Sequence, residues 1–496
     1  MSQIKAGAVL SYTGVAFNTI AGLLYTPWMV SCVGVDNYGL YTLALSVINF
    51  FLLDFGLSES VSRYLSKYYA EGEADRIPSF LGVTYKMYLV ITLFIAVVLL
   101  GVFLNIDAIY SGLTREQLPV FRILFIIISL YSVVSFPFAP LNGILVSNER
   151  FVALNACSLV QKVLTVLLIV AALLLGQGIY ALVAANAFVS VVITIVKLVL
   201  VHVKTDVRVD FSHGGIAAMR EVVSFSAWVM VTNVCGRLIF SIMPTIIAAT
   251  STSSEVALFG LASSLEGYVY TVASALNGMF MPRVSRSLAG GDEGLQQLMT
   301  RVGRIQLYII GFIFVCFASI GGRFVSAWMG PGYERLWPCT ILLIVPSVIE
   351  LPQLIGVTAI TASGKVRAKA IVYIVMSVTN VVLGLLLTRI FGALGACISI
   401  CFAYLLRTAG QNVIYTRLLG IRVGLFFRDT YARWAGVAMA VLVFGCLVSI
   451  SVPADGWVGF LACASIVLVV YTVLLWAFVM NDYEKELVLS LFHLAR

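Results

Sequence analysis

The chain has 496 residues, of which 61% are hydrophobic and only 11% charged, and its mean hydropathy is +1.03. Soluble domains carry about 25% charged residues, so this composition excludes a soluble globular protein and predicts a polytopic helical membrane protein. The net charge of +8 does not indicate nucleic-acid binding, because the sequence has no basic run with interleaved aromatic residues. A bias of Lys and Arg toward cytoplasmic loops accounts for the excess.

Cysteine and histidine do not form a metal-binding pattern in this sequence. The nine cysteines lie mostly in apolar stretches and are interpreted as small packing residues, and the three histidines are placed near the cytoplasmic edge. The sequence has no Gly-rich phosphate loop. We therefore expect no cofactor, no metal and no nucleic-acid partner. The start of the chain runs directly into a long apolar stretch without a cleavage site, which favours a retained first helix over a signal peptide.

Hydropathy predicts about fourteen membrane-spanning helices, each long enough to cross a hydrocarbon core of about 30 Å. In chain order the predicted spans are residues 6–31, 40–66, 79–103, 119–145, 152–175, 178–203, 221–249, 257–284, 301–325, 337–362, 368–389, 393–419, 431–451 and 457–480. The fold class is therefore an all-α polytopic membrane protein, and no aqueous domain interrupts the spans.

The distribution of Lys and Arg predicts the orientation of the chain. Most of these residues fall at alternate loops, and Arg304 and Arg407 are assigned to the same face as Lys5 and Lys485. Because Lys and Arg near short loops stay in the cytoplasm, we expect both termini to be cytoplasmic. The loop near residues 325–338 is then external.

An internal repeat appears at a spacing of roughly 220 residues, and six helices per repeat give the two halves the same orientation. One match is Gly39-Leu40 with Gly260-Leu261. Parallel repeats of this kind place a substrate cavity between two lobes. The predicted organisation is an N-terminal six-helix lobe at 1–210, a C-terminal six-helix lobe at 211–420, and two additional helices with a short cytoplasmic tail at 421–496.

The first hairpin, about residues 11–69, carries the most distinctive motifs. These are Pro27, the turn Gly34-Val35-Asp36-Asn37-Tyr38-Gly39-Leu40-Tyr41, and the return-helix segments Asp54-Phe55-Gly56-Leu57 and Arg63-Tyr64-Leu65. The hairpin resembles the opening of Wzx-type polysaccharide and O-antigen flippases of the multidrug/oligosaccharidyl-lipid/polysaccharide (MOP) exporter superfamily. The resemblance implies a MATE-like fold, and the two extra C-terminal helices are similar to those of the superfamily's oligosaccharide and lipid flippases.

Basic residues within the predicted spans are the candidates for binding an anionic head group, because a charge at that depth is costly. Arg237 lies near the middle of its span, with Asn233 and Ser241 four residues to either side on the same helical face. Lys162 lies on a similar polar stripe. We expect these two residues to line a cavity, with a buried structural ion pair as the alternative.

Two further bases, Lys86 and Arg122, lie closer to the ends of their spans. Each is either a cavity residue or a side chain that extends toward the membrane surface.

Three acidic residues within the spans are candidates for ion coupling: Asp54, Glu266 and Glu350. Glu350 lies between Pro346 and Pro352, where a broken helix frees carbonyl groups that need a partner. Two interpretations remain open. Either these acids neutralise Arg237 or Lys162, or one of them takes up the coupling ion, H⁺ or Na⁺.

The resemblance implies a flippase, not an enzyme, that moves a polyprenyl-pyrophosphate-linked oligosaccharide across the bacterial cytoplasmic (inner) membrane for cell-surface polysaccharide synthesis. Its implied partners are the lipid-linked oligosaccharide and polysaccharide-assembly proteins. One alternative is a cation-coupled multidrug antiporter of the same fold. Another is a membrane glycosyltransferase or polymerase, which the short outer loops disfavour. The sequence does not identify the sugar, the polyprenyl carrier or the oligomeric state.

Overall fold

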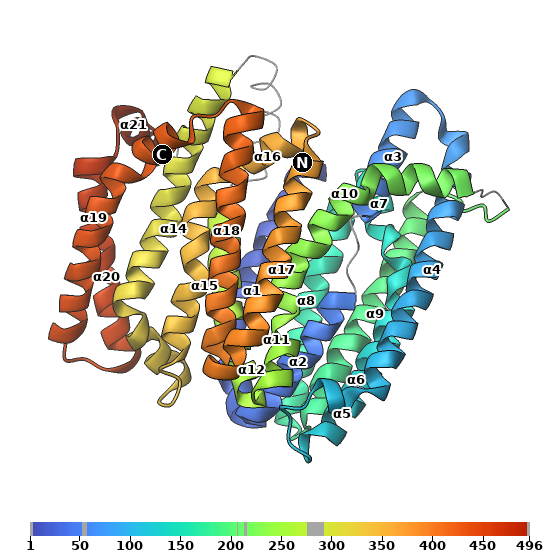
Figure 1. Cartoon of the computed structure of the whole chain (residues 1–496), viewed down its shortest axis with the longest axis horizontal. Helices are drawn as coiled ribbons and strands as arrows, with labels where there is room; N and C mark the ends of the chain where they lie inside the picture. Colours follow the sequence, from blue (N-terminus) through green and yellow to red (C-terminus); the bar gives the residue numbers. More distant parts are fainter. Residues whose placement is uncertain (1–2, 52–56, 206, 213–215, 275–291, 494–496) are drawn as a thin grey trace. The chain divides into compact units, whose positions relative to one another are not determined.

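The computed structural model describes residues 3–51, 57–205, 207–212, 216–274 and 292–493, and the regular secondary structure in these ranges is helical (Figure 1). The chain forms two compact units. The first unit comprises Met1–Gly260 and Ser377–Ala396, and the second comprises Leu261–Met376 and Cys397–Arg496. Helices α12, α17 and α18 each contribute residues to both units.

The helices that begin in the first unit run from the N-terminus to α12. They are α1 (Gln3–Val33), α2 (Val35–Phe51), α3 (Leu57–Glu71), η1 (Ala74–Arg76), α4 (Ile77–Leu104), α5 (Ile106–Ile109), α6 (Gln117–Ser135), η2 (Phe136–Phe138), α7 (Pro140–Ser147), α8 (Phe151–Leu174), α9 (Ile179–Lys204), α10 (Ile216–Ser241), α11 (Met243–Thr250) and α12 (Ser253–Ser274). Within this unit α8 packs against α1 and α9, and α6 packs against α2 and α9.

The remaining helices follow in chain order. They are α14 (Asp292–Met329), α15 (Leu336–Glu350), η4 (Leu351–Gln353), α16 (Leu354–Ala362), α17 (Val366–Phe391), α18 (Ala393–Leu419), α19 (Val423–Ser451), α20 (Gly456–Leu474), the π-helical turn η5 (Leu475–Val479) and α21 (Asp482–His493). In the second unit α14 packs against α15, α19 and α20. The core of this packing includes Trp434, whose indole N–H donates to the Tyr471 hydroxyl at 2.9 Å.

Eleven helices in the described ranges are long and apolar enough to cross a membrane, and the pair α10 and α11, bent by 41°, makes up to twelve. Each of these spans, with the bent pair counted as one, corresponds to one of the predicted spans from the third (79–103) to the fourteenth (457–480). The predicted span 6–31 falls within α1, and the predicted span 40–66 covers parts of α2 and α3 with residues 52–56 outside the described ranges. The polytopic helical class is confirmed, and the count of fourteen stays a prediction.

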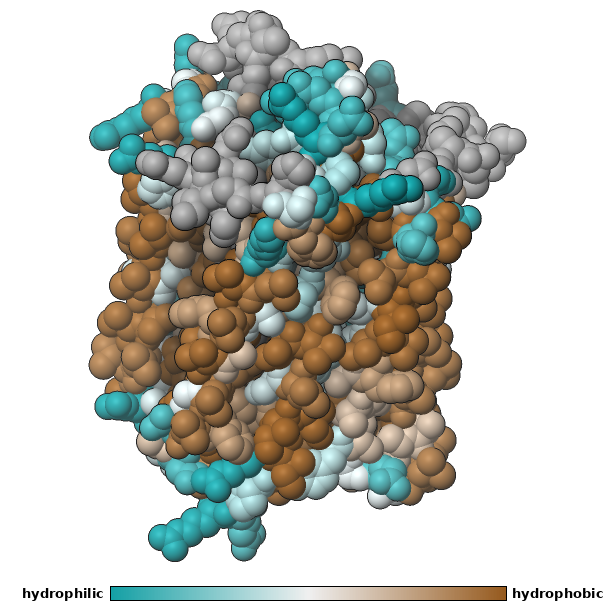
Figure 2. Space-filling model, turned by 90° about the vertical axis from the view of Figure 1, so that its right-hand side faces the viewer, coloured by the Kyte–Doolittle hydropathy of each residue, from teal (hydrophilic) through white to brown (hydrophobic). Residues whose placement is uncertain are grey.

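The surface of α4 has the character of a membrane-facing helix. Its exposed apolar side chains are Leu89, Val90, Leu93, Phe94, Val97, Leu100 and Leu104. Figure 2 shows the face of the molecule that carries α4, with apolar residues covering its middle and polar residues gathered toward its two ends. An apolar band of this kind matches the hydrocarbon core of a bilayer.

The motif-bearing hairpin begins with a tight turn between α1 and α2. Gly34 has a φ of +83°, a conformation in which a side chain would be strained, and it ends α1 so that α2 can start at Val35. Asp36 in the first turn of α2 accepts hydrogen bonds from the hydroxyls of Ser253 at 2.7 Å and Ser254 at 2.6 Å. The hairpin motif therefore joins the α1–α2 turn to the start of α12.

The two glycines matched in the sequence repeat lie at one crossing of α2 and α12. A Cβ on Gly39 would lie 2.0 Å from the Ser253 carbonyl oxygen, and a Cβ on Gly260 would lie 2.6 Å from Thr42 Cγ2. Neither position has room for a side chain, so the absence of a Cβ on both helices permits their close approach.

Candidate functional site

The polar stripe predicted on residues 233–241 lies on α10 in the first unit. Arg237 is exposed, and no hydrogen-bond or ion-pair partner for it lies within the described residues. Asn233 and Ser241, one turn to either side, are partly buried. Because residues four apart share a helical face, Arg237 lies one turn from Ser241 on the same side of α10. Its guanidinium is thus solvent-accessible in the structure.

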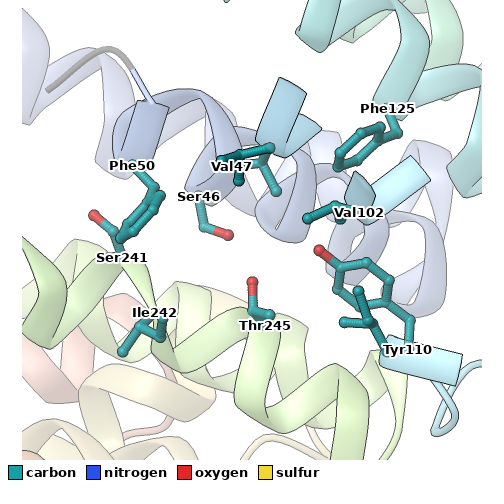
Figure 3. Close-up of a pocket in the computed structure, with 11 residues that line it drawn as sticks. Ser46, Val47, Phe50, Val102, Tyr110, Phe125, Ser241, Ile242 and Thr245 are labelled. Carbon is teal, nitrogen blue, oxygen red and sulfur yellow. The ribbon is translucent and has the colours of Figure 1, made fainter. Parts of the chain in front are cut away.

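Ser241 lines a cavity of about 220 Å³ within the first unit. The walls come from α2, α4, α5, α6 and the bend between α10 and α11, and they are mainly apolar. Figure 3 shows the hydroxyls of Ser46, Tyr110 and Thr245 pointing toward the middle of the cavity. The Tyr110 and Thr245 side chains hydrogen-bond to each other, and the Ser46 hydroxyl donates to the Leu43 carbonyl at 2.7 Å. The space beside the Arg237 face therefore suits an uncharged group.

The other predicted bases of the first unit have separate surroundings. Lys162 on α8 is half-buried and donates to the Gly14 carbonyl of α1 at 3.4 Å, a long contact. Arg122 is exposed and forms an ion pair with Asp107 at 2.5 Å, so it is already partly neutralised. Lys86 on α4 is half-buried, and its side chain is also engaged with a neighbouring group. Lys162 and Arg122 therefore contact groups on other elements than the Arg237 stripe.

The acidic candidates Glu266 and Glu350 lie together in the second unit. Glu266 on α12 accepts a hydrogen bond from the Ser347 hydroxyl of α15 at 3.4 Å, and Glu350 ends α15 where the helix breaks at η4. Both side chains are buried. Asp54, the third candidate, lies outside the described residues.

Glu350 forms a buried ion pair with Arg407 of α18. The Arg407 guanidinium also lies over the rings of Tyr404 at 4.1 Å and Tyr373 at 5.4 Å. Such a cation between aromatic faces and a carboxylate is held in one place. The sequence suggests Arg237 or Lys162 as the partner of this acid, whereas in the structure its partner is Arg407.

Arg407 is the residue of this site whose buried position the distribution of Lys and Arg does not predict. That distribution places it with the cytoplasmic face, and in the structure it lies within the membrane-spanning helix Ala393–Leu419 and is 4% exposed. A usable signal was present, because Tyr404 and Gln411 stand three and four residues away on the same helical face. Ser347 and Tyr373 carried no comparable signal in the sequence.

The helical membrane-spanning fold and the buried charges within its spans define a transporter class of membrane protein. A family match over residues 4–288 identifies the chain more closely: it belongs to the polysaccharide biosynthesis protein family. The resemblance of the first hairpin to Wzx-type flippases of the MOP superfamily is thereby confirmed.

Two relatives align over most of the chain. It is 23% identical to the uncharacterized membrane protein EpsK of Bacillus subtilis over 482 residues, 94% of each chain. It is 20% identical to a putative O-antigen transporter of Shigella flexneri, over 85% of this chain and 99% of that protein.

Solved structures with the same fold are transporters and flippases. The lipid II flippase MurJ in its inward closed conformation aligns with a TM-score of 0.74 at 13% identity, over 94% of this chain and 98% of MurJ. An inward-facing multidrug-resistance MATE transporter of the MOP superfamily aligns with a TM-score of 0.59 at 13% identity, over 82% of this chain and 98% of that one. The fold is therefore MurJ-like and MATE-like.

Proposed function

We propose that this protein is a flippase that moves a polyprenyl-pyrophosphate-linked oligosaccharide from the cytoplasmic to the outer leaflet of the bacterial cytoplasmic membrane, for cell-surface polysaccharide synthesis. It works by alternating access coupled to a gradient of H⁺ or Na⁺. Its chain forms fourteen spans with both termini in the cytoplasm, in two parallel six-helix lobes at 1–210 and 211–420 followed by two helices at 421–496. Polysaccharide-assembly proteins are its expected partners.

The observation that carries this proposal is the guanidinium of Arg237 within the bent span Met230–Thr250, which has no ion-pair partner in the part of the chain that the structure describes. A charge within a span is tolerated when it faces a partner or a water-filled space. Arg holds a phosphate through two parallel hydrogen bonds, which suits a pyrophosphate at a place where no carboxylate of the described residues neutralises it. The adjoining cavity with Ser241 and Thr245 gives an uncharged sugar a place beside that anchor.

The test is transport of lipid-linked oligosaccharide, isolated from a strain that lacks this protein, into the outer leaflet of vesicles. Arg237→Ala removes a charge-assisted contact of about 1.5–3 kcal/mol, so we expect transport to fall about 10- to 150-fold at unchanged membrane abundance. Arg237→Lys retains the charge but not the paired hydrogen bonds and is expected to fall less. Arg76→Ala, an exposed arginine of η1, is the matched control and is expected to transport normally.

A structural role for Arg237 gives a different result. If its charge balanced Glu266, then Arg237→Ala and Glu266→Gln would each lower membrane abundance, and the double variant would restore both abundance and transport. Restored transport in the double variant would contradict the anchor role.

A cation-coupled multidrug antiporter of the same fold is the second candidate. Buried acids such as Glu266 favour it, because a cationic drug needs an acidic partner. The two functions separate in cells that lack the protein: a flippase restores surface polysaccharide without changing drug susceptibility, whereas an antiporter does the reverse.

A further inference from the structure

The buried charges of the second unit do not balance. Glu266 and Glu350 are each 8% exposed and Arg407 is 4% exposed. The cluster thus contains two carboxyl groups and one guanidinium, all removed from water. Because Arg keeps its charge at any physiological pH, the excess negative charge can be removed only if one of the two carboxyl groups takes up a proton or another cation.

Arg407 forms an ion pair with only one of these two acids. It forms the ion pair with Glu350 and is held by the rings of Tyr404 and Tyr373. Tyr373 also hydrogen-bonds to Arg407, which further fixes the position of the guanidinium. The Glu350–Arg407 pair is therefore a neutral, permanent unit.

Among the described residues, no such counter-charge pairs with Glu266. The groups that face it or interact with it electrostatically are Ser347 and Glu350 from α15, Tyr270 from its own helix, and Tyr404 from α18. Of these, only Glu350 carries a charge, and its charge is negative. Apolar side chains complete the surroundings, since Val348 and Leu351 belong to the hydrophobic core against which Tyr270 packs. A buried ionised carboxylate in such a place is strongly disfavoured unless it gains a cation.

We infer that Glu266 is a single-proton site, with the Glu350–Arg407 pair as its internal neutral neighbour, so that the coupling ion of this transporter is H⁺ and not Na⁺. The proton binds one carboxylate oxygen of Glu266 and leaves it on deprotonation, with no other bond changed. This assignment of the ion rests on the proposed function, whereas the protonation of Glu266 does not.

The ligand geometry separates the proton from a metal cation. A hard cation needs several oxygen ligands around it, with its charge matched by carboxylates. Here the second carboxylate, that of Glu350, is occupied by the Arg407 guanidinium, which takes the place that a metal cation would fill. Among the described residues, the Ser347 hydroxyl is the hydrogen-bond partner of Glu266, so the several further oxygen ligands that Na⁺ needs are not in place there. A proton needs only the one carboxylate.

Buried amide side chains adjoin the cluster. Both polar atoms of the Gln353 amide have no hydrogen-bond partner among the described residues, and the side chains of Gln353 and Gln411 are each only 1% exposed. Buried polar groups of this kind are commonly satisfied by internal water. Gln411 hydrogen-bonds to Tyr373 and the Gln353 carbonyl accepts from Tyr415, so these amides adjoin the cluster.

The experiment is infrared difference spectroscopy of the full-length protein in lipid nanodiscs, which detects the carbonyl band of a protonated carboxylic acid without any substrate. We expect such a band at neutral pH in the unmodified protein and its loss in Glu266→Gln. We also expect its loss in Glu350→Gln, although that variant leaves Glu266 intact, because Arg407 then has only Glu266 to pair with. Replacing sodium chloride by potassium chloride should not change the band.

Glu334→Gln is the matched control, since Glu334 is an exposed acid in the loop between α14 and α15, and its spectrum should match that of the unmodified protein. Size-exclusion profiles identify variants that have not folded, and because two different variants must lose the band, misfolding of one does not decide the result. No band in the unmodified protein, a band that survives in Glu266→Gln, or a band that shifts with Na⁺ would each overturn the inference.

Transport separates this inference from the proposed function. If a pH gradient drives transport of lipid-linked oligosaccharide in the unmodified protein and this is lost in Glu266→Gln, then both stand. If Glu266→Gln keeps full gradient-driven transport, the coupling role of Glu266 is overturned and the flippase function stands. If the unmodified protein shows the band but moves no lipid-linked oligosaccharide, the flippase function falls and the proton site remains.

Discussion

The Arg304 guanidinium of α14 and the Glu484 carboxylate of α21 form a buried paired contact, with Nε 2.6 Å from Oε1 and Nη2 3.0 Å from Oε2. Arg304 also donates to the carbonyls of Asp429 and Val479, each at 2.7 Å. Glu484 in turn accepts from the Tyr308 hydroxyl at 2.9 Å. Through the Glu484 side chain, these contacts attach α21 to the core of the second unit.

Glu484→Ala should therefore destabilise the second unit. Its loss leaves the Arg304 charge buried and unpaired, and we expect a decrease of about 3 kcal/mol in the free energy of unfolding. Thermal unfolding in detergent would measure the effect. Glu486→Ala, an exposed acid two residues along the same helix, is the control and should change stability by less than about 0.5 kcal/mol. Equal stability of the two variants would show that the pair does not anchor α21.

The same pair predicts a dependence of stability on pH. Burial is the largest single influence and would raise the pKa of Glu484, but the hydrogen bonds and charge of Arg304, together with hydrogen bonds from the Asn481 backbone and the Tyr308 hydroxyl, outweigh it and hold the pKa below its ordinary value. Because the folded pKa is the lower one, the stabilisation is fully present above the unfolded pKa of about 4.3 and is lost as the pH falls through the folded value. The unfolding midpoint should drop less between about pH 5 and pH 3 in Glu484→Gln than in the unmodified protein. Parallel profiles for the two proteins would refute this.

Arg304 and Arg407 also show what the sequence could and could not determine. Hydropathy predicts the spans, because a helix of about 20 consecutive apolar residues has the length and polarity that cross the hydrocarbon core of a membrane. Both arginines lie within the predicted helical regions or at their edges, and their charge predicts the cytoplasmic face without indicating a partner. Their positions depend on Glu484 and Glu350, acids 180 and 57 residues away in the chain, and no local pattern reports such a pairing.

The predicted stripe of Asn233, Arg237 and Ser241 required only helical periodicity, and α10 provides it. The separation of Lys162 and Arg122 from that stripe could not be predicted, because it follows from contacts with Gly14 and Asp107 on other helices. The break at η4 was signalled by Pro352, whereas Pro346 is accommodated within α15. A proline indicates where a backbone hydrogen bond of the helix is missing, but the packing around it decides whether the helix ends there.

The crossing of α2 and α12 gives a prediction about packing. Gly39→Ala would bring a Cβ within 2.0 Å of the Ser253 carbonyl oxygen, so the helices must move apart. We expect a loss of about 1–3 kcal/mol in unfolding free energy. Gly101→Ala is the control, since a Cβ on Gly101 of α4 would meet no atom within 4 Å. It should leave stability unchanged or raise it by about 0.5–1 kcal/mol. A neutral Gly39→Ala would mean that the crossing is loosely packed.

The last prediction concerns the orientation of the chain in the membrane, with the loop after α14 outside and the segment after α9 inside. Ser326 and Ser212 are both exposed, so a cysteine at either position is accessible to a reagent from its own side of the membrane. Cys32, at the end of α1, is the exposed native cysteine among the described residues and must be replaced first. In a cysteine-free background, an impermeant maleimide added to intact cells should label Ser326→Cys and spare Ser212→Cys.

Permeabilised cells supply the control for that experiment, because Ser212→Cys must react once the reagent can enter. Cys32 offers an independent check: α1 starts on the predicted cytoplasmic side and crosses once, so Cys32 itself should react from outside when it is restored. The physical basis is the retention of Lys and Arg in the cytoplasm during insertion. Labelling of Ser212→Cys in intact cells, with Ser326→Cys and Cys32 protected, would show that the chain has the opposite orientation.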